Sequence, residues 1–195
     1  MTNATASQET RTARDALHDW VRGTEYVFSR GQATAYGTAV GVAIGIGLGF
    51  LDVDLTLGPQ LLMLLAAAVI TVVLLHEGLH GGTGRMLGHR PVFGFQPPLV
   101  YTTFREKIPR DNLIVIAIAP LLILDAVFIT LYTLGWLETF AVLCFAVNTI
   151  GAMGDVWIAL KISRCSRRDF IQDTKTGVTV WRRTAPRAND SANRT

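Results

Sequence analysis

Long apolar stretches separated by short polar connections dominate the hydrophobic pattern of the chain. Four of these stretches approach or exceed the roughly 20 residues that a helix needs to cross a bilayer. They cover residues 32–51, 59–80, 112–134 and 137–162. Since half of the 195 residues are hydrophobic, the pattern predicts an all-α polytopic membrane protein of four transmembrane helices.

The rest of the chain divides into two tails around one membrane domain. Residues 1–30 are expected to form a cytoplasmic tail with an interfacial helix, because Trp20 and Tyr26 stand among charged residues just before the first span. Residues 31–162 are expected to form the transmembrane domain. Residues 163–195 are expected to form a second cytoplasmic tail.

Two short β-rich patterns interrupt the helical one. Between the second and third spans, segments 92–96 and 99–104 are rich in β-branched and aromatic residues and flank a Pro-Pro pair. This pattern predicts a short cytoplasmic hairpin, whose edge can pair with an extended substrate strand. An ordinary interfacial loop is the alternative. A second small hairpin is expected at 170–181 in the C-terminal tail.

The positively charged residues are confined to the two tails and one connection between spans. All 18 Lys and Arg residues lie in 1–31, in 81–111 or after residue 160. The positive-inside rule therefore places both termini and the 81–111 connection in the cytoplasm, with the chain in the cell membrane. A basic chain can also indicate nucleic-acid binding. Membrane orientation explains the distribution of Lys and Arg better. We therefore expect the chain to contact the lipid bilayer and not to bind nucleic acid.

The first span carries a repeated small residue. Gly37, Gly41, Gly45 and Gly49 recur every fourth position, which makes a flat face that another backbone can approach closely. We expect this face to pack against the other helices of the chain. A homo-oligomer interface is the alternative use.

Candidate chemistry is concentrated in His76-Glu77-Gly78-Leu79-His80, at the end of the second apolar stretch. In a helix, His76 and His80 share a face and can bind one Zn²⁺, while Glu77 can act as a general base. Ionisable groups at membrane depth are costly and are usually functional. The motif predicts a zinc hydrolase with one zinc ion per chain, and two interfacial histidines are the structural alternative.

A catalytic zinc site usually has three protein ligands, and the candidates for the third are His89, Asp125 and Asp155. With a rise of 1.5 Å per residue, the motif and Asp155 both lie roughly 27–28 Å from the outer face. Asp125 lies more than about 15 Å too far outward. Depth therefore favours Asp155, and His89 is the weaker candidate. Asp125 is expected to form an interhelical hydrogen bond or to be protonated.

Asn148 stands two helical turns before Asp155 on the same face. Its amide can support the ligands or hold the substrate backbone. A polar contact between helices is the structural alternative.

The histidine motif and the segment from Asn148 to Asp155 resemble the site-2 protease type of intramembrane metalloprotease. More narrowly, residues 30–185 are similar to a family of small four-helix putative zincin peptidases. The resemblance implies that His76, His80 and Asp155 bind zinc and that Glu77 is catalytic.

The last helix departs from the site-2 protease pattern. Gly151 stands where those proteases typically have a proline, and Val156 follows Asp155 in place of a glycine. Because of this departure, the resemblance assigns neither a role to Asn148 nor a transmembrane helix as the substrate.

The pattern as a whole predicts a membrane zinc metalloprotease that hydrolyses a membrane protein or peptide near the cytoplasmic boundary. The alternative is a non-catalytic membrane protein with a structural or regulatory zinc site, against which Glu77 argues. The chain has four His, which cannot supply the histidine clusters of a di-iron desaturase. Asp125 and the broken helices are the features that suggest a transporter.

Overall fold

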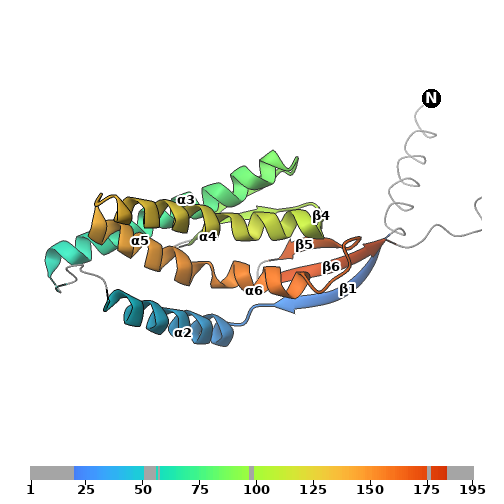
Figure 1. Cartoon of the computed structure of the whole chain (residues 1–195). Helices are drawn as coiled ribbons and strands as arrows, with labels where there is room; N and C mark the ends of the chain where they lie inside the picture. The colour runs from blue at the N-terminus through green and yellow to red at the C-terminus, as the bar shows by residue number, and fades with distance from the viewer. Residues whose placement is uncertain (1–19, 51–55, 57, 97–98, 175–176, 184–195) are drawn as a thin grey trace, which may run out of the picture.

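Helices running alongside one another, with strands gathered at one end, make up the computed structural model (Figure 1). It describes residues 20–50, 56, 58–96, 99–174 and 177–183. The helices are α2 (Arg30–Leu48), α3 (Pro59–Met86), α4 (Arg110–Thr133), α5 (Glu138–Gly151) and α6 (Met153–Ile162). The strands are β1 (Trp20–Val27), β2 (Pro91–Gln96), β3 (Leu99–Phe104), β4 (Ile108–Pro109), β5 (Phe170–Thr174) and β6 (Gly177–Arg183).

Three of the described helical segments are long and apolar enough to cross a membrane. They are α3, α4 and the nearly continuous segment Glu138–Ile162, which combines α5 and α6. Helix α2 forms where the first span was expected, but it is not among the three. Its five glycines and the polar residues Gln32, Thr34 and Thr38 lower the hydropathy that longer apolar side chains give to the other helices.

The strands correct the expectation of an all-α fold. An antiparallel four-stranded sheet has the order β1-β6-β5-β4, and β2 pairs with β3 in a separate two-stranded sheet. Both expected hairpins are confirmed, since β2 pairs with β3 and β5 with β6. The Pro-Pro pair at 97–98 lies outside the described residues.

The expected interfacial helix before the first span is wrong for residues 20–27. This segment is strand β1, and it pairs antiparallel with β6, from Trp20 opposite Arg183 to Val27 opposite Gly177. β-branched and aromatic side chains favour such a paired surface, and β6 supplies the partner that local sequence does not reveal. Residues 1–19 and 184–195 of the two tails lie outside the described residues.

Helix α3 continues past the glycines that follow its second histidine and ends at Met86, well beyond residue 80, where the apolar stretch that predicted it ends. Packing explains the difference. A Cβ at Gly81 would lie 2.3 Å from the ring of Phe93, and one at Gly84 would lie 2.4 Å from the ring of Phe104. The missing side chains let the β2–β3 hairpin lie directly on the helix, which offsets the cost of about 1 kcal/mol per helical glycine.

Part of the glycine face of α2 packs inside the chain, as expected. A Cβ at Gly37 or Gly41 would lie 3.8 or 3.7 Å from the side chain of Ile150 on α5. A Cβ at Gly45 would meet nothing within 4 Å. The use of this face in a homo-oligomer stays a prediction.

Candidate metal centre

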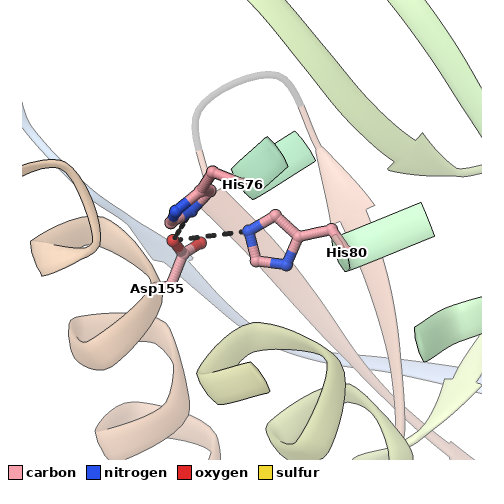
Figure 2. Close-up of side chains that lie close together, drawn as sticks. All are labelled: His76, His80 and Asp155. Carbon is pink, nitrogen blue, oxygen red and sulfur yellow. Dashed lines mark hydrogen bonds and ion pairs between the residues drawn. The ribbon is translucent and has the colours of Figure 1, made fainter. Parts of the chain in front are cut away.

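Two histidines of α3 and one aspartate of α6 converge inside the bundle (Figure 2). The Nε2 atoms of His76 and His80 lie 3.0 and 3.5 Å from Oδ2 of Asp155. One ligand atom from each residue falls within 4.8 Å of the others, and both histidines are buried. The structure therefore brings together the three residues that the motif and the depth argument selected.

Local structure explains how each ligand reaches the centre. His76 and His80 are one helical turn apart on α3, so their side chains project from the same face. Asp155 lies in the first turn of α6, where the positive end of the helix dipole stabilises a carboxylate. The break at Ala152, between α5 and α6, separates this turn from the helix that carries Asn148.

Asn148 fixes the orientation of His76. Its Oδ1 accepts a hydrogen bond from Nδ1 of His76 over 2.9 Å. Its Nδ2 donates to Oδ1 of Asp125 over 2.8 Å, and the other carboxylate oxygen accepts from Thr149 over 3.0 Å. The expected interhelical hydrogen bond of Asp125 is thus confirmed. A buried chain of partners runs from α4 through Asn148 to the first histidine.

His80 is oriented by the backbone of α4. Its Nδ1 donates to the carbonyl oxygen of Ile116 over 2.9 Å. In a regular helix, that carbonyl accepts from the N–H four residues later, but residue 120 is a buried proline inside α4. Because proline has no N–H, Pro120 leaves the carbonyl of Ile116 available to His80.

These hydrogen bonds test whether the centre suits a metal ion. A carbonyl or amide oxygen accepts from each Nδ1, so both histidines carry their proton there and present the lone pair of Nε2 to the centre. Two such lone pairs then face a carboxylate oxygen of Asp155. A cation between these groups, or a proton on Nε2 of a histidine, would satisfy acceptors that converge in this way. Two imidazoles and a carboxylate, with the imidazoles held by outer partners, match a catalytic zinc site.

The motif glutamate stands beside this centre. Glu77 lines a cavity of about 310 Å³ together with His76, Asn148 and Asp155. Its backbone carbonyl accepts a hydrogen bond from the hydroxyl of Thr102 on β3 over 2.8 Å. The β2–β3 hairpin is thereby attached to the helix at the glutamate itself.

His89 takes part in a different contact. Its Nδ1 lies 3.0 Å from Oε1 of Glu106, and its Nε2 accepts from Asn112 over 3.0 Å. In the described part of the chain, the group of potential ligands contains His76, His80 and Asp155, and His89 is not a member. His89 instead joins the connection after α3 to the start of α4.

Three contributions to the site were not anticipated from the sequence. They are the carbonyl of Ile116, the Thr102 bond to the motif, and a bond of 2.6 Å from the hydroxyl of Thr103 to Oδ2 of Asp173. Burial raises the pKa of the Asp173 carboxyl, although the Thr103 hydrogen bond acts in the opposite direction. Pro120 was the sequence signal for the contribution of the Ile116 carbonyl, because a helical proline frees the carbonyl four residues earlier. The two threonine contacts join segments distant in sequence and leave no local signal.

Comparisons with known proteins agree with this geometry. A family model described as "Putative zincin peptidase" matches residues 69–170, a range that includes all three potential ligands. An uncharacterized 24.7 kDa protein of Pyrococcus woesei is 28% identical over 134 residues, which cover 65% of this chain and 59% of the relative. The chain thus spans less than two thirds of that relative. No solved structure matches.

Proposed function

Because the chain belongs to the putative zincin peptidase family, we propose that it is a membrane-embedded zinc metalloprotease that cleaves peptide bonds near the cytoplasmic boundary. One observation carries the proposal. His76, His80 and Asp155 bring their ligand atoms within 4.8 Å of one another, and the motif glutamate lines the adjoining cavity.

Each residue has a distinct role in this reaction. His76, His80 and Asp155 would hold the ion, and zinc would supply Lewis-acid chemistry there by polarising a carbonyl and lowering the pKa of a water molecule. Glu77 accepts the proton of the attacking water and passes it to the leaving amine. Asn148 is a positioning residue, since its hydrogen bond holds His76 in the tautomer that presents Nε2.

The substrate is proposed to bind as an extended strand along β3. Within the described residues, β2 and β3 pair with each other alone, so β3 keeps one edge without a strand partner. Val100 of β3 lines the cavity beside Glu77. A peptide that pairs with this edge through backbone hydrogen bonds would therefore pass the candidate metal centre.

The four-stranded sheet supports an orientation with four crossings. It joins β1 before α2, β4 before α4, and the β5–β6 hairpin after α6 (Figure 1). Strands of one sheet lie on one side of a membrane, so the chain between β1 and β4 must cross an even number of times. If α3 crosses once, the segment that contains α2 supplies the second crossing. The distribution of Lys and Arg supports a cytoplasmic location for the side of the membrane on which this sheet lies.

Cysteine labelling in intact cells tests this orientation. In a chain without Cys144 and Cys165, a new cysteine at Ser29 or Ser163 should stay protected from a membrane-impermeant maleimide until the cells are permeabilised. A cysteine at Trp136, between α4 and α5, should react from outside. Labelling of the cysteines introduced at Ser29 and Ser163 from opposite sides of the membrane would contradict the proposal.

Zinc content and proteolysis together test the function. Purified wild-type chain in detergent should hold about one zinc ion and cleave labelled casein. Glu77→Gln should keep the zinc and lose at least about 100-fold in rate, since general-base catalysis contributes about 10²–10⁴-fold. Asp155→Ala should lose the zinc and the activity. Hydrolysis by Glu77→Gln at the wild-type rate would overturn the proposal. Zinc binding without hydrolysis, with unfolding on chelation, would instead indicate a structural zinc site.

A further inference from the structure

The cavity beside the candidate metal centre has apolar walls and two wall positions without side chains. Apart from the site residues, its lining comes from Val72, Val73, Val147, Val100, Gly151 and Gly154. These residues belong to α3, α5, β3 and the start of α6. The cavity therefore offers apolar contact directly beside the atoms that would act on a peptide bond.

The size of the cavity limits what can enter it. The cavity volume is about 310 Å³. A single side chain and its adjoining peptide group fit.

Gly151 lines this cavity and leaves space for a larger residue. It is the last residue of α5, and it is not among the described glycines with positive φ, so other residues can adopt its backbone conformation. A Cβ added to Gly151 meets nothing within 4 Å. A Cβ added to Gly154 would instead lie 3.6 Å from the ring of Phe28. Of the two glycines in the wall, Gly151 is therefore the one at which an added side chain has open space.

We propose that this cavity is a specificity pocket for one apolar side chain, of about the size of leucine or phenylalanine, next to the scissile bond of an extended substrate. Gly151 sets how large that side chain can be. The inference rests on the proposed protease function, because it places the pocket beside the reacting carbonyl.

Binding of single-residue probes tests the pocket without turnover. The probes are the N-acetyl hydroxamates of alanine, leucine, phenylalanine and lysine, titrated into the zinc-loaded full chain in detergent. The wild type should bind the leucine and phenylalanine probes at least about tenfold more tightly than the alanine probe, the range expected for extra apolar groups in such a pocket. The lysine probe should bind more weakly than the leucine probe.

The variant Gly151→Leu should remove this preference or reverse it toward alanine. Its matched control is Gly82→Leu, because a Cβ at Gly82 also meets nothing within 4 Å and Gly82 does not line the cavity. The control should keep the wild-type order of affinities. The smaller variant Gly151→Ala should give an intermediate preference, and it keeps the test valid should the leucine variant fail to fold.

Proteolysis of a randomised peptide pool, with new termini read by mass spectrometry, gives a second readout. Leucine and phenylalanine should be enriched beside the cleaved bond in the wild type, and small residues in Gly151→Leu. Equal affinity for all four hydroxamates, or an unchanged preference in both Gly151 variants, would overturn the specificity pocket and leave the protease proposal standing. Zinc-loaded wild-type chain that neither binds any hydroxamate nor cleaves the pool would overturn both.

Discussion

The Nδ1–H of His80 donates to the backbone carbonyl of Ile116 across 2.9 Å, and thus a residue of α4 orients a potential ligand on α3. The carbonyl is available because Pro120 has no N–H to offer it. A proline inside a predicted transmembrane helix is usually discussed as the cause of a kink. Here it also supplies an acceptor at the depth of the candidate metal centre.

Replacing this proline should weaken zinc binding. In Pro120→Ala, the restored N–H competes with His80 for the Ile116 carbonyl. The loss of such an outer partner typically lowers metal affinity 10–100-fold, and we expect about tenfold. Competition against a chromophoric zinc chelator measures the change. Pro59→Ala is the matched control, because Pro59 begins α3, where a missing N–H has no helical partner. An unchanged affinity in Pro120→Ala would exclude this role.

Removal of the Asn148 amide should have a similar or larger effect. Asn148→Ala leaves Nδ1 of His76 without its buried acceptor, so zinc affinity should fall 10–100-fold. Thr149→Val is a close control, since it removes the bond to Asp125 one step farther from the histidine. We expect its effect to stay below about threefold. Equal losses in both variants would show that general packing, and not the His76 contact, determines affinity.

The surface of α3 at Gly81 and Gly84, on which the β2–β3 hairpin packs, should not tolerate an added methyl group. In Gly84→Ala, the new Cβ meets the Phe104 ring at 2.4 Å, and overpacking of this kind typically costs about 1–3 kcal/mol. SDS titration of the folded chain measures the loss. The pair Gly84→Ala with Phe104→Leu should recover part of the stability, and Gly82→Ala should not destabilise. Wild-type stability in Gly84→Ala alone would contradict the packing of the hairpin on this helix.

Asp173 should make stability fall as pH rises above the ordinary range of an aspartate. Burial raises its pKa in the folded chain, so the folded state holds the proton more tightly than the unfolded state does. The associated stability is fully present below about pH 4 and is lost as the pH rises through the raised pKa. Asp173→Asn should therefore melt about 2–4 °C higher at pH 7, the shift that about 1 kcal/mol produces in a chain of this length.

The advantage of Asp173→Asn should shrink when melting is followed by intrinsic tryptophan fluorescence at pH 5. Glu25→Gln is the control, because Glu25 forms an exposed ion pair with Arg22, a kind of contact that contributes little. An Asp173→Asn difference that stays constant between pH 5 and pH 7 would exclude titration of this carboxyl as the cause.

The sequence could predict the features that follow from local patterns, such as the helical positions of the potential ligands and the hairpins. The four-residue spacing of His76 and His80, together with a constant helical rise, located Asp155 as the third member of the centre. Short segments rich in β-branched and aromatic residues located the β2–β3 hairpin, and the β5–β6 hairpin was also expected from the sequence. Strand β1 could not be predicted, because its partner β6 follows about 150 residues later. The apolar stretch 59–80 stopped short of the end of α3 at Met86, because the helix continues through Gly81 and Gly84, whose environment is determined by Phe93 and Phe104.

The order of strands in the four-stranded sheet has a consequence for biogenesis. Strand β6 lies between β1 and β5, although it is the last described strand to leave the ribosome. Until residues 177–183 emerge, β1 has no neighbour in its sheet, and Asp173 has only just become available to Thr103 on the hairpin. The hairpin beside Glu77 therefore gains its contact with Asp173 only after all the described helices have been synthesised.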